Sequence, residues 1–168
     1  MPVLETKRLT LRRMTLEDAP FILRLVNEPS WLRFIGDKNV RNLDDARRYI
    51  QTGPLDMYAK FGFGMFLVQL MSSGEAIGAC GLLKRDTLPA PDIGYAFLPE
   101  FWGQGYAFEA AAAVLSYGHK NHGLNRIMAI TSPDNASSVR VLERCGMKFE
   151  RMLAMSETDE VKLFSLEF

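Results

Sequence analysis

The chain has 168 residues and a formal net charge of zero at pH 7, with 48% hydrophobic and 24% charged residues. This composition is typical of one globular domain, which we expect to span residues 1–168, and the balanced charge gives no sign of a nucleic-acid surface. No apolar run approaches the ~20 residues of a membrane span, and Glu5 and Arg8 stand where a signal peptide would have its apolar core, so we expect a cytoplasmic protein without membrane association.

The N-terminal residues predict a strand followed by a helix. Leu9 and Leu11 alternate with polar residues, as in a strand that buries one face. Thr15 and Asp18 have the spacing of a capping box, which satisfies two backbone N–H groups at the start of a helix. Apolar residues at helical spacing follow, and we expect Asn27-Glu28-Pro29 to end that helix.

Residues 31–83 predict a connection, a second helix and a β-hairpin. We interpret Trp31 to Gly36, which is rich in aromatic residues, as a connecting segment. A second helix is expected to begin after Asn42, and Gly53-Pro54 is expected to break or kink it. Gly64 to Leu70 and Ala76 to Leu83 flank a short Ser-Ser-Gly turn, which is typical of a hairpin.

The second half of the chain alternates strands with helices. The expected strands are residues 92–98, 126–131, 148–155 and 161–168, and the expected helices are residues 107–117 and 135–145. The complete order is β, α, α, β, β, β, α, β, α, β, β. This order predicts an α/β fold in which helices cover a mixed sheet.

Residues 99–109, Pro-Glu-Phe-Trp-Gly-Gln-Gly-Tyr-Ala-Phe-Glu, join a predicted strand to a predicted helix through two glycines. Gly103 and Gly105 allow a tight turn and a close backbone approach to a ligand. The N–H groups of Gln104 to Phe108 have no carbonyl partners in the first helical turn, and the positive helix end adds to their preference for an anion. The segment therefore predicts a phosphate-binding loop.

Two common phosphate loops are excluded by the residues present. Tyr106-Ala107 replaces the Lys-Ser or Lys-Thr of a Walker A motif, and Phe108 occupies the third glycine position of a dinucleotide fingerprint. Trp102 to Ala107 instead resembles the phosphate loop of the GNAT superfamily of acyl-CoA-dependent N-acyltransferases, Gln/Arg-x-x-Gly-x-Gly/Ala. Trp102 departs from the usual polar residue, but the ribosomal-protein N-terminal acetyltransferase branch commonly reads Trp-Gly-x-Gly-Tyr-Ala.

Two further segments carry the same resemblance. Glu5 to Arg12, followed by Thr15 to Ala19, is similar to the opening of that branch, and Asn135 to Met147 is similar to its last helix and turn. The three matches occur in the expected order and cover nearly the whole chain. They imply the GNAT-type fold, which has a mixed, mostly antiparallel sheet with a splayed parallel strand pair, flanked by about four helices.

The resemblance implies acetyl-CoA as acyl donor and assigns roles to residues. Backbone N–H groups of Phe97 and Leu98 would hold the thioester carbonyl oxygen. Asn135 would bind the pantetheine arm and Ser138 would donate a proton or hydrogen bond to the leaving sulfur. The alternative interpretation of the residues alone is that Asp134, Asn135 and Ser138 are an N-cap and first-turn polar residues. The residues implied to bind the cofactor are Phe97, Leu98, Gly103, Gln104, Gly105, Tyr106, Ala107, Phe108 and Asn135.

The general base and the phosphate partners are less well defined. Asp92 opens the strand before the loop, close to where some superfamily members carry a catalytic glutamate, and Glu100 is a second candidate. Either carboxylate could act through water, attract a cationic substrate or be a surface residue. Arg140 and Arg144 could contact CoA phosphates or be solvated helix charges.

The cysteines and histidines predict no metal site and no covalent chemistry. Cys80 and Cys145 lie far apart without a Cys-x-x-Cys motif, so we expect two free thiols. His119 and His122 close a helical stretch without carboxylates at ligand spacing, which favours a capping or surface role.

We therefore predict an N-acetyltransferase that moves an acetyl group from acetyl-CoA directly to a primary amine, with a protein or peptide N-terminal α-amine as the expected acceptor. A small-molecule amine acetyltransferase, acting on an aminoglycoside, polyamine or amino acid, is an alternative of the same fold. A non-catalytic acyl-CoA-binding sensor is another. The terminal strand pair offers an edge for self-association, so the expected state is a monomer or homodimer.

Overall fold

A computed structural model describes all residues 1–168. It contains one eight-stranded sheet with the strand order β1-β2-β3-β4-β5-β6-β8-β7, in which only β5 and β6 run parallel. The strands are β1 Pro2–Glu5, β2 Leu9–Arg13, β3 Met65–Leu70, β4 Ala76–Leu83, β5 Asp92–Phe97, β6 Arg126–Thr131, β7 Lys148–Ala154 and β8 Glu160–Glu167.

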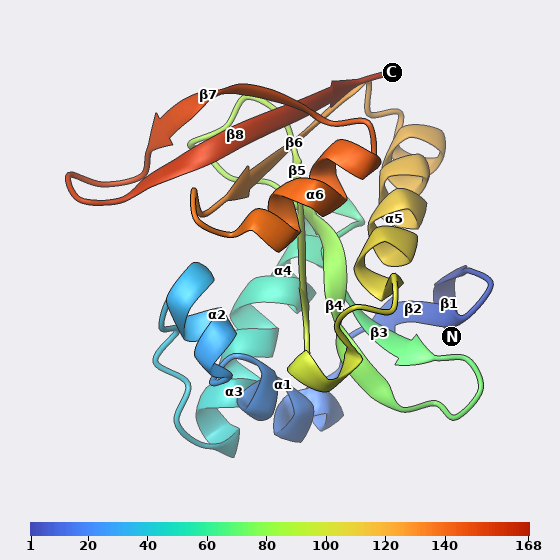
Figure 1. The fold of residues 1–168 in the computed structure, drawn as a ribbon. Coiled ribbons are helices and arrows are strands. Elements are labelled where there is room, and N and C mark those ends of the chain that lie inside the picture. Colours follow the sequence, from blue (N-terminus) through green and yellow to red (C-terminus); the bar gives the residue numbers. More distant parts are fainter.

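Six α-helices cover the two faces of this sheet. They are α1 Ala19–Leu25, α2 Pro29–Phe34, α3 Leu43–Ile50, α4 Asp56–Phe61, α5 Tyr106–His122 and α6 Ala136–Arg144. The buried residues of α1, α2 and α3 belong to one apolar core, and those of α4, α5 and α6 belong to the other. In Figure 1, α1 to α3 lie together in the lower part of the view, and α5 and α6 lie next to each other in the upper part. None of these helices combines the length and the apolar character that crossing a bilayer requires.

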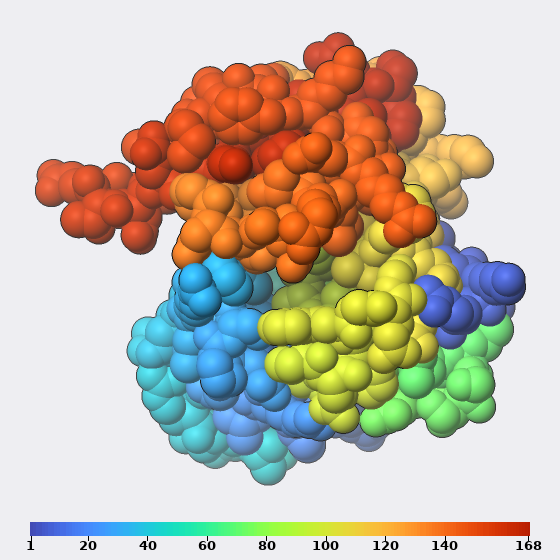
Figure 2. Space-filling model, viewed as in Figure 1, coloured from blue at the N-terminus to red at the C-terminus, as the bar shows by residue number.

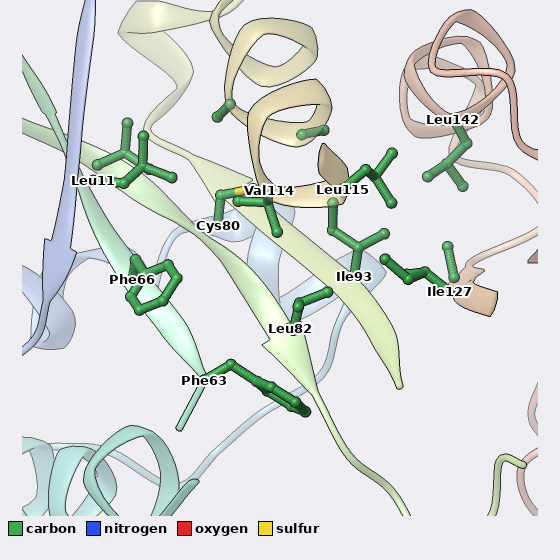
Figure 3. Close-up of a cluster of buried hydrophobic side chains, with 14 of the residues drawn as sticks. Leu11, Phe63, Phe66, Cys80, Leu82, Ile93, Val114, Leu115, Ile127 and Leu142 are labelled. Atoms are coloured by element: carbon green, nitrogen blue, oxygen red, sulfur yellow. The ribbon is translucent and has the colours of Figure 1, made fainter. Parts of the chain in front are cut away.

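Alternating strand residues build a separate core on each face. Phe66, Cys80 and Leu82 point towards α5, where they pack with its Val114 and Leu115 (Figure 3). The intervening strand residues pack against α1 and α3 on the other face. Because the central strands β3 and β4 contribute to both cores, this part of the sheet lies between two apolar layers, as the sequence order predicts.

The parallel pair β5 and β6 separates soon after it begins. β4 and β5 are in register at six residue pairs, but β5 and β6 are in register only at Asp92 and Met128. The remainder of β5 has a hydrogen-bonded neighbour on one side only. The splayed parallel pair expected for the GNAT-type fold is therefore confirmed.

The predicted elements agree with the structure except at three places within residues 1–55. The Thr15 and Asp18 capping box forms, and Asn42 caps α3. Trp31 to Gly36 is not simply a connection, because Pro29 starts the short helix α2 at a position where its fixed φ and missing N–H suit a first turn. The short strand β1 was not predicted, since its four residues show no clear alternation. Gly53-Pro54 does not break the second helix but passes through a π-helical turn into α4.

Candidate active site

The loop between β5 and α5 presents a run of backbone N–H groups without protein partners. Its two glycines adopt left-handed backbone angles, with φ of 75° at Gly103 and 83° at Gly105. Backbone hydrogen bonding stops at Trp102, which donates to the Pro99 carbonyl, and resumes at Glu109, which donates to the Gly105 carbonyl. The amides between Trp102 and Glu109 are therefore free at the start of a 17-residue helix, which is the geometry of an anion site.

The turn between β1 and β2 supports this loop from outside. Glu109 on α5 accepts hydrogen bonds from the Thr6 hydroxyl at 2.6 Å and from the Arg8 backbone N–H at 2.9 Å and Nε at 2.8 Å. Burial alone would raise the pKa of Glu109, but these hydrogen bonds outweigh it and hold the pKa below its usual value. The Arg8 guanidinium also stacks over the Tyr106 ring at 4.3 Å, so a cation is fixed beside the free amides.

A second arginine approaches the loop from α6. The Arg144 guanidinium lies 4.0 Å from the centre of the Phe108 ring. Arg8 and Arg144 both line a hollow of about 600 Å³ beside the start of α5. Its complete lining is Thr6, Arg8, Gln104, Gly105, Phe108, Glu109, Ala112 and Arg144. The hollow thus combines the Arg144 guanidinium, the guanidinium of the Arg8–Glu109 ion pair and backbone donors, which suits a ligand with several phosphates.

Only one of the two expected carbonyl-binding amides is available. The Leu98 N–H donates to the Ile77 carbonyl on β4 at 2.9 Å, so the expectation that it is free is wrong. Because amides alternate in direction along an antiparallel strand, the preceding Phe97 N–H faces away from β4, towards the opening beside β6. The Phe97 carbonyl accepts a hydrogen bond from Trp102 Nε1 at 2.9 Å, which ties the loop to the end of β5.

Asn135 and Ser138 both lie at the start of α6, and Ser138 contacts β5. Asn135 caps the helix, since its Oδ1 accepts from the Ser138 N–H at 3.2 Å, and its Nδ2 makes no hydrogen bond within the protein. Ser138 also contacts a residue not singled out from the sequence. The Tyr95 hydroxyl on β5 is 3.0 Å from both the Ser138 carbonyl oxygen and Ser138 Oγ.

The opening between β5 and β6 reaches the surface. Gly94, Tyr95 and Ala96 are only half-buried, although they are in the middle of a central strand whose Ile93 and Phe97 are buried. Figure 2 shows a recess at this place, with α2 in light blue, α6 in orange and the phosphate-binding loop in yellow around it. The open edge of β5, the start of α6 and the phosphate-binding loop therefore border one cleft.

Asp92 is not close to this group. Phe97 is five residues further along the extended strand, a distance of about 16 Å. Its side chain is 1% exposed, and its carboxylate oxygens accept from Arg85 Nε at 3.1 and 3.2 Å. Burial raises the pKa of Asp92 to about 6, although the charge and hydrogen bond of Arg85 oppose the shift. Glu100, the second candidate, pairs with Arg24 at the surface.

The cysteines do not form a nucleophilic site. Cys80 is buried and Cys145 is partly buried, and both are free thiols. Burial raises the pKa of Cys145 to about 11, which keeps the thiol protonated at neutral pH. The structure contains no group of three or more His, Cys, Asp or Glu side chains placed to hold a metal ion.

The sequence did not predict the roles of three residues of the site: Arg8 beside the free amides, Trp102 as an anchor of the loop, and Tyr95 as the partner of Ser138. Arg8 and Tyr95 contact partners 101 and 43 residues away along the chain, so no local spacing marks them. Trp102 lies within the recognised motif, but its bond to the Phe97 carbonyl depends on how the loop folds back.

Comparison with known proteins agrees with this geometry. Residues 8–148 match the acetyltransferase (GNAT) domain family. The uncharacterized N-acetyltransferase YoaA of Bacillus subtilis (strain 168) is 34% identical over 154 residues, covering 90% of this chain and 86% of YoaA. The crystal structure of an acetyltransferase from Agrobacterium tumefaciens str. C58 is 25% identical with a TM-score of 0.85, covering 100% of this chain and 95% of that chain.

A further similar structure is that of RimL, a ribosomal L7/L12 alpha-N-protein acetyltransferase, in complex with coenzyme A. It is 19% identical with a TM-score of 0.85, covering 99% of this chain and 98% of that chain. The chain belongs to the GNAT acetyltransferase family and is an acyl-CoA-dependent N-acetyltransferase.

Proposed function

We propose that the protein binds acetyl-CoA in the cleft beside β5 and acetylates a protein or peptide N-terminal α-amine. The observation that carries this proposal is the run of free amides from Gly103 to Phe108, which opens next to the unpaired side of β5. A ligand with a pyrophosphate and a long amide-bearing arm satisfies both groups of backbone donors at once. The RimL structure, which contains coenzyme A, supports the assignment of this ligand.

The residues present fit such a ligand. The amides of the loop would hold the pyrophosphate, and Arg8 and Arg144 supply positive charge beside it. A Cβ at Gly105 would stand 3.4 Å from Arg8 Nη2, so a side chain there would fill the space in which backbone and guanidinium meet. The free Nδ2 of Asn135 would donate to an amide carbonyl of the pantetheine arm.

Catalysis would depend mainly on positioning and hydrogen bonding. When bound, acetyl-CoA supplies a thioester for the amine to attack. The Phe97 N–H would stabilise negative charge on the carbonyl oxygen, and Ser138 Oγ would donate to the sulfur as the C–S bond breaks. The amine nitrogen loses one proton and the sulfur gains one, so no other reactant is needed. Cys145 takes no part, because its pKa of about 11 leaves little thiolate.

The engagement of both candidate carboxylates by arginines favours an α-amine acceptor. Asp92 is buried against Arg85 and Glu100 is paired with Arg24, so neither belongs to this proposal as a general base. Deprotonating a lysine amine at pH 7 costs about 4.6 kcal/mol, but deprotonating an α-amine costs only about 1 kcal/mol. The RimL neighbour, named as an alpha-N-protein acetyltransferase, supports the same acceptor class.

The proposal is tested in two steps. Calorimetric titration should give saturable binding of acetyl-CoA and CoA and no binding of ATP, and absence of acetyl-CoA binding at millimolar ligand would remove the cleft assignment. Mass spectrometry should then detect acetylation of peptides with a free N-terminus and an internal lysine. The same peptides with a blocked N-terminus should be unreactive. Transfer only to the lysine, or only to small amines such as polyamines, would contradict the α-amine proposal.

A further inference from the structure

Tyr95 connects β5 to α6 across the cleft, at a place where β5 makes no backbone pairing with β6. It lies on β5, two residues before Phe97, and its hydroxyl reaches Ser138 on α6. Past Asp92 and Met128, β5 and β6 have no register pairs. Tyr95 thus fixes the distance between the strand that would bind the carbonyl oxygen and the helix that would serve the leaving sulfur.

The hydrogen-bond count at this contact allows two arrangements. The Ser138 carbonyl oxygen can only accept, so in one arrangement the Tyr95 hydroxyl donates to that carbonyl and the Ser138 hydroxyl donates to Tyr95 Oη. In the other arrangement, Tyr95 donates to Ser138 Oγ. The Ser138 proton is then free to point into the cleft, and its donor strength is increased because Oγ itself accepts a hydrogen bond.

From this geometry we propose that Tyr95 is a positioning residue, whose hydroxyl holds Ser138 Oγ at the open side of β5 and directs the Ser138 proton to the leaving sulfur. The inference rests on the proposed function, because it needs a thioester in this cleft. It adds a residue on β5 to a role that the sequence assigned to Ser138 alone.

The surroundings of both residues suit this role. Burial raises the pKa of Tyr95, although its hydrogen bond with Ser138 opposes the shift, so the phenol stays a proton donor at physiological pH. The Ser138 N–H is held by Asn135 Oδ1, and its carbonyl by Tyr95. With the Ser138 N–H held by this cap, rotation of the two hydroxyl groups interconverts the arrangements, and in the second the Ser138 carbonyl gives up its hydrogen bond from Tyr95.

The test removes the Tyr95 hydroxyl and keeps the ring. Tyr95→Phe should lower kcat about 10- to 100-fold, with the KM for acetyl-CoA changed less than about twofold. Tyr117→Phe is the matched control, since it removes a phenol bonded to His122 at 2.9 Å, in the same apolar core but away from the cleft. Ser138→Ala and the double variant complete a cycle, in which the double variant should be no slower than Ser138→Ala.

A binding measurement gives a second readout that does not depend on turnover. The affinity of CoA relative to its desulfo analogue should rise from pH 7 to pH 9 in the original protein, because the cleft stabilises a bound thiolate. This rise should be smaller in Tyr95→Phe. A simple packing defect would weaken both ligands equally and leave the rise unchanged, which would contradict the inference.

The outcomes separate this inference from the proposed function. If the original protein does not bind acetyl-CoA, the proposed function fails. If it turns over but Tyr95→Phe is as fast as Tyr117→Phe, only the inference fails. If the losses of kcat in the two single variants multiply in the double variant, Tyr95 acts without Ser138 and the inference is overturned. The same holds if Tyr95→Phe lowers kcat while Ser138→Ala keeps full activity.

Discussion

Replacing Asp92 with asparagine should change how the stability of the protein depends on pH. Asp92 is 1% exposed, and its pKa is raised from 3.8 to about 6, mainly by burial. The folded protein therefore binds a proton at this site more tightly than the unfolded chain does. Asp92 stabilises the fold most below pH 3.8, and this contribution is lost as the pH rises towards 6.

The size of the effect follows from the shift. A difference of about two pKa units corresponds to about 3 kcal/mol over the whole range, of which about 2 kcal/mol falls between pH 4.5 and pH 7.5. The free energy of unfolding of Asp92→Asn minus that of the original protein should thus be about 2 kcal/mol higher at pH 7.5 than at pH 4.5, because only the original protein loses stability as the pH rises. Taking the difference between variants cancels the titration of all other groups.

Urea denaturation followed by circular dichroism at the two pH values measures this quantity. Asp56→Asn is the control, because it removes a carboxylate from an exposed pair with Lys60, and exposed pairs contribute little. Asp92→Asn should also keep its acetyltransferase activity, since Asp92 is about 16 Å from Phe97. A pH-independent difference in stability would refute the reasoning about burial, and loss of turnover without loss of CoA binding would restore Asp92 as a catalytic candidate.

Three further variants test the cleft. Gly105→Val should weaken CoA binding at least about 10-fold. Gly74→Val is its control, because Gly74 has a similar φ of 76° in an open turn; this variant should share the backbone strain of about 1 to 2 kcal/mol and bind CoA normally. Equal CoA affinity of the two variants would contradict the role of the phosphate-binding loop. Arg144→Ala should weaken the affinity for CoA about 10-fold in calorimetry and leave the affinity for phosphate-free pantetheine unchanged. Arg13→Ala, which removes the cation–π contact with Tyr58, is its control. An equal loss of affinity for pantetheine would contradict a phosphate contact of Arg144. Ser138→Ala should lower kcat by about 10- to 1000-fold with little change in CoA affinity, and the exposed neighbour Ser137→Ala should not; unchanged turnover would remove Ser138 from the mechanism.

The parts of the site that the sequence predicted are those fixed by local geometry. Two glycines followed by an apolar helical run determine that the amides of the loop are free, whatever the rest of the chain does. The Thr15 and Asp18 capping box and the hairpin of β3 and β4 are equally local, and they form as expected. Helix α2 shows the limit of such signals, because a proline can follow the end of one helix or occupy the first turn of another. Pro29 begins α2, whose buried residue is Trp31, and that burial depends on tertiary packing.

The parts that the sequence did not predict depend on tertiary structure. Asp92 is the first residue of β5, the strand that borders the cleft, but the sequence does not reveal at which end of β5 the sheet separates. In the structure, Asp92 lies at the end that is still paired with β6. The Leu98 amide was expected to be free, but the register of β4 and β5 uses it. Tyr95 reads as an ordinary strand residue until α6 packs across the opening and brings Ser138 to its hydroxyl.

The splay of β5 explains why the two halves of the site must be formed together. An unpaired strand edge inside a sheet leaves backbone donors and acceptors that have to find other partners. The Phe97 carbonyl finds one in Trp102, which draws the loop onto the strand end, and the adjacent Phe97 N–H still faces the cleft. The same bond that fixes the phosphate-binding amides therefore also fixes the distance from them to the donor for the acyl oxygen. A substitution that loosens Trp102 should consequently impair CoA binding and turnover together, whereas loss of Ser138 should impair turnover alone.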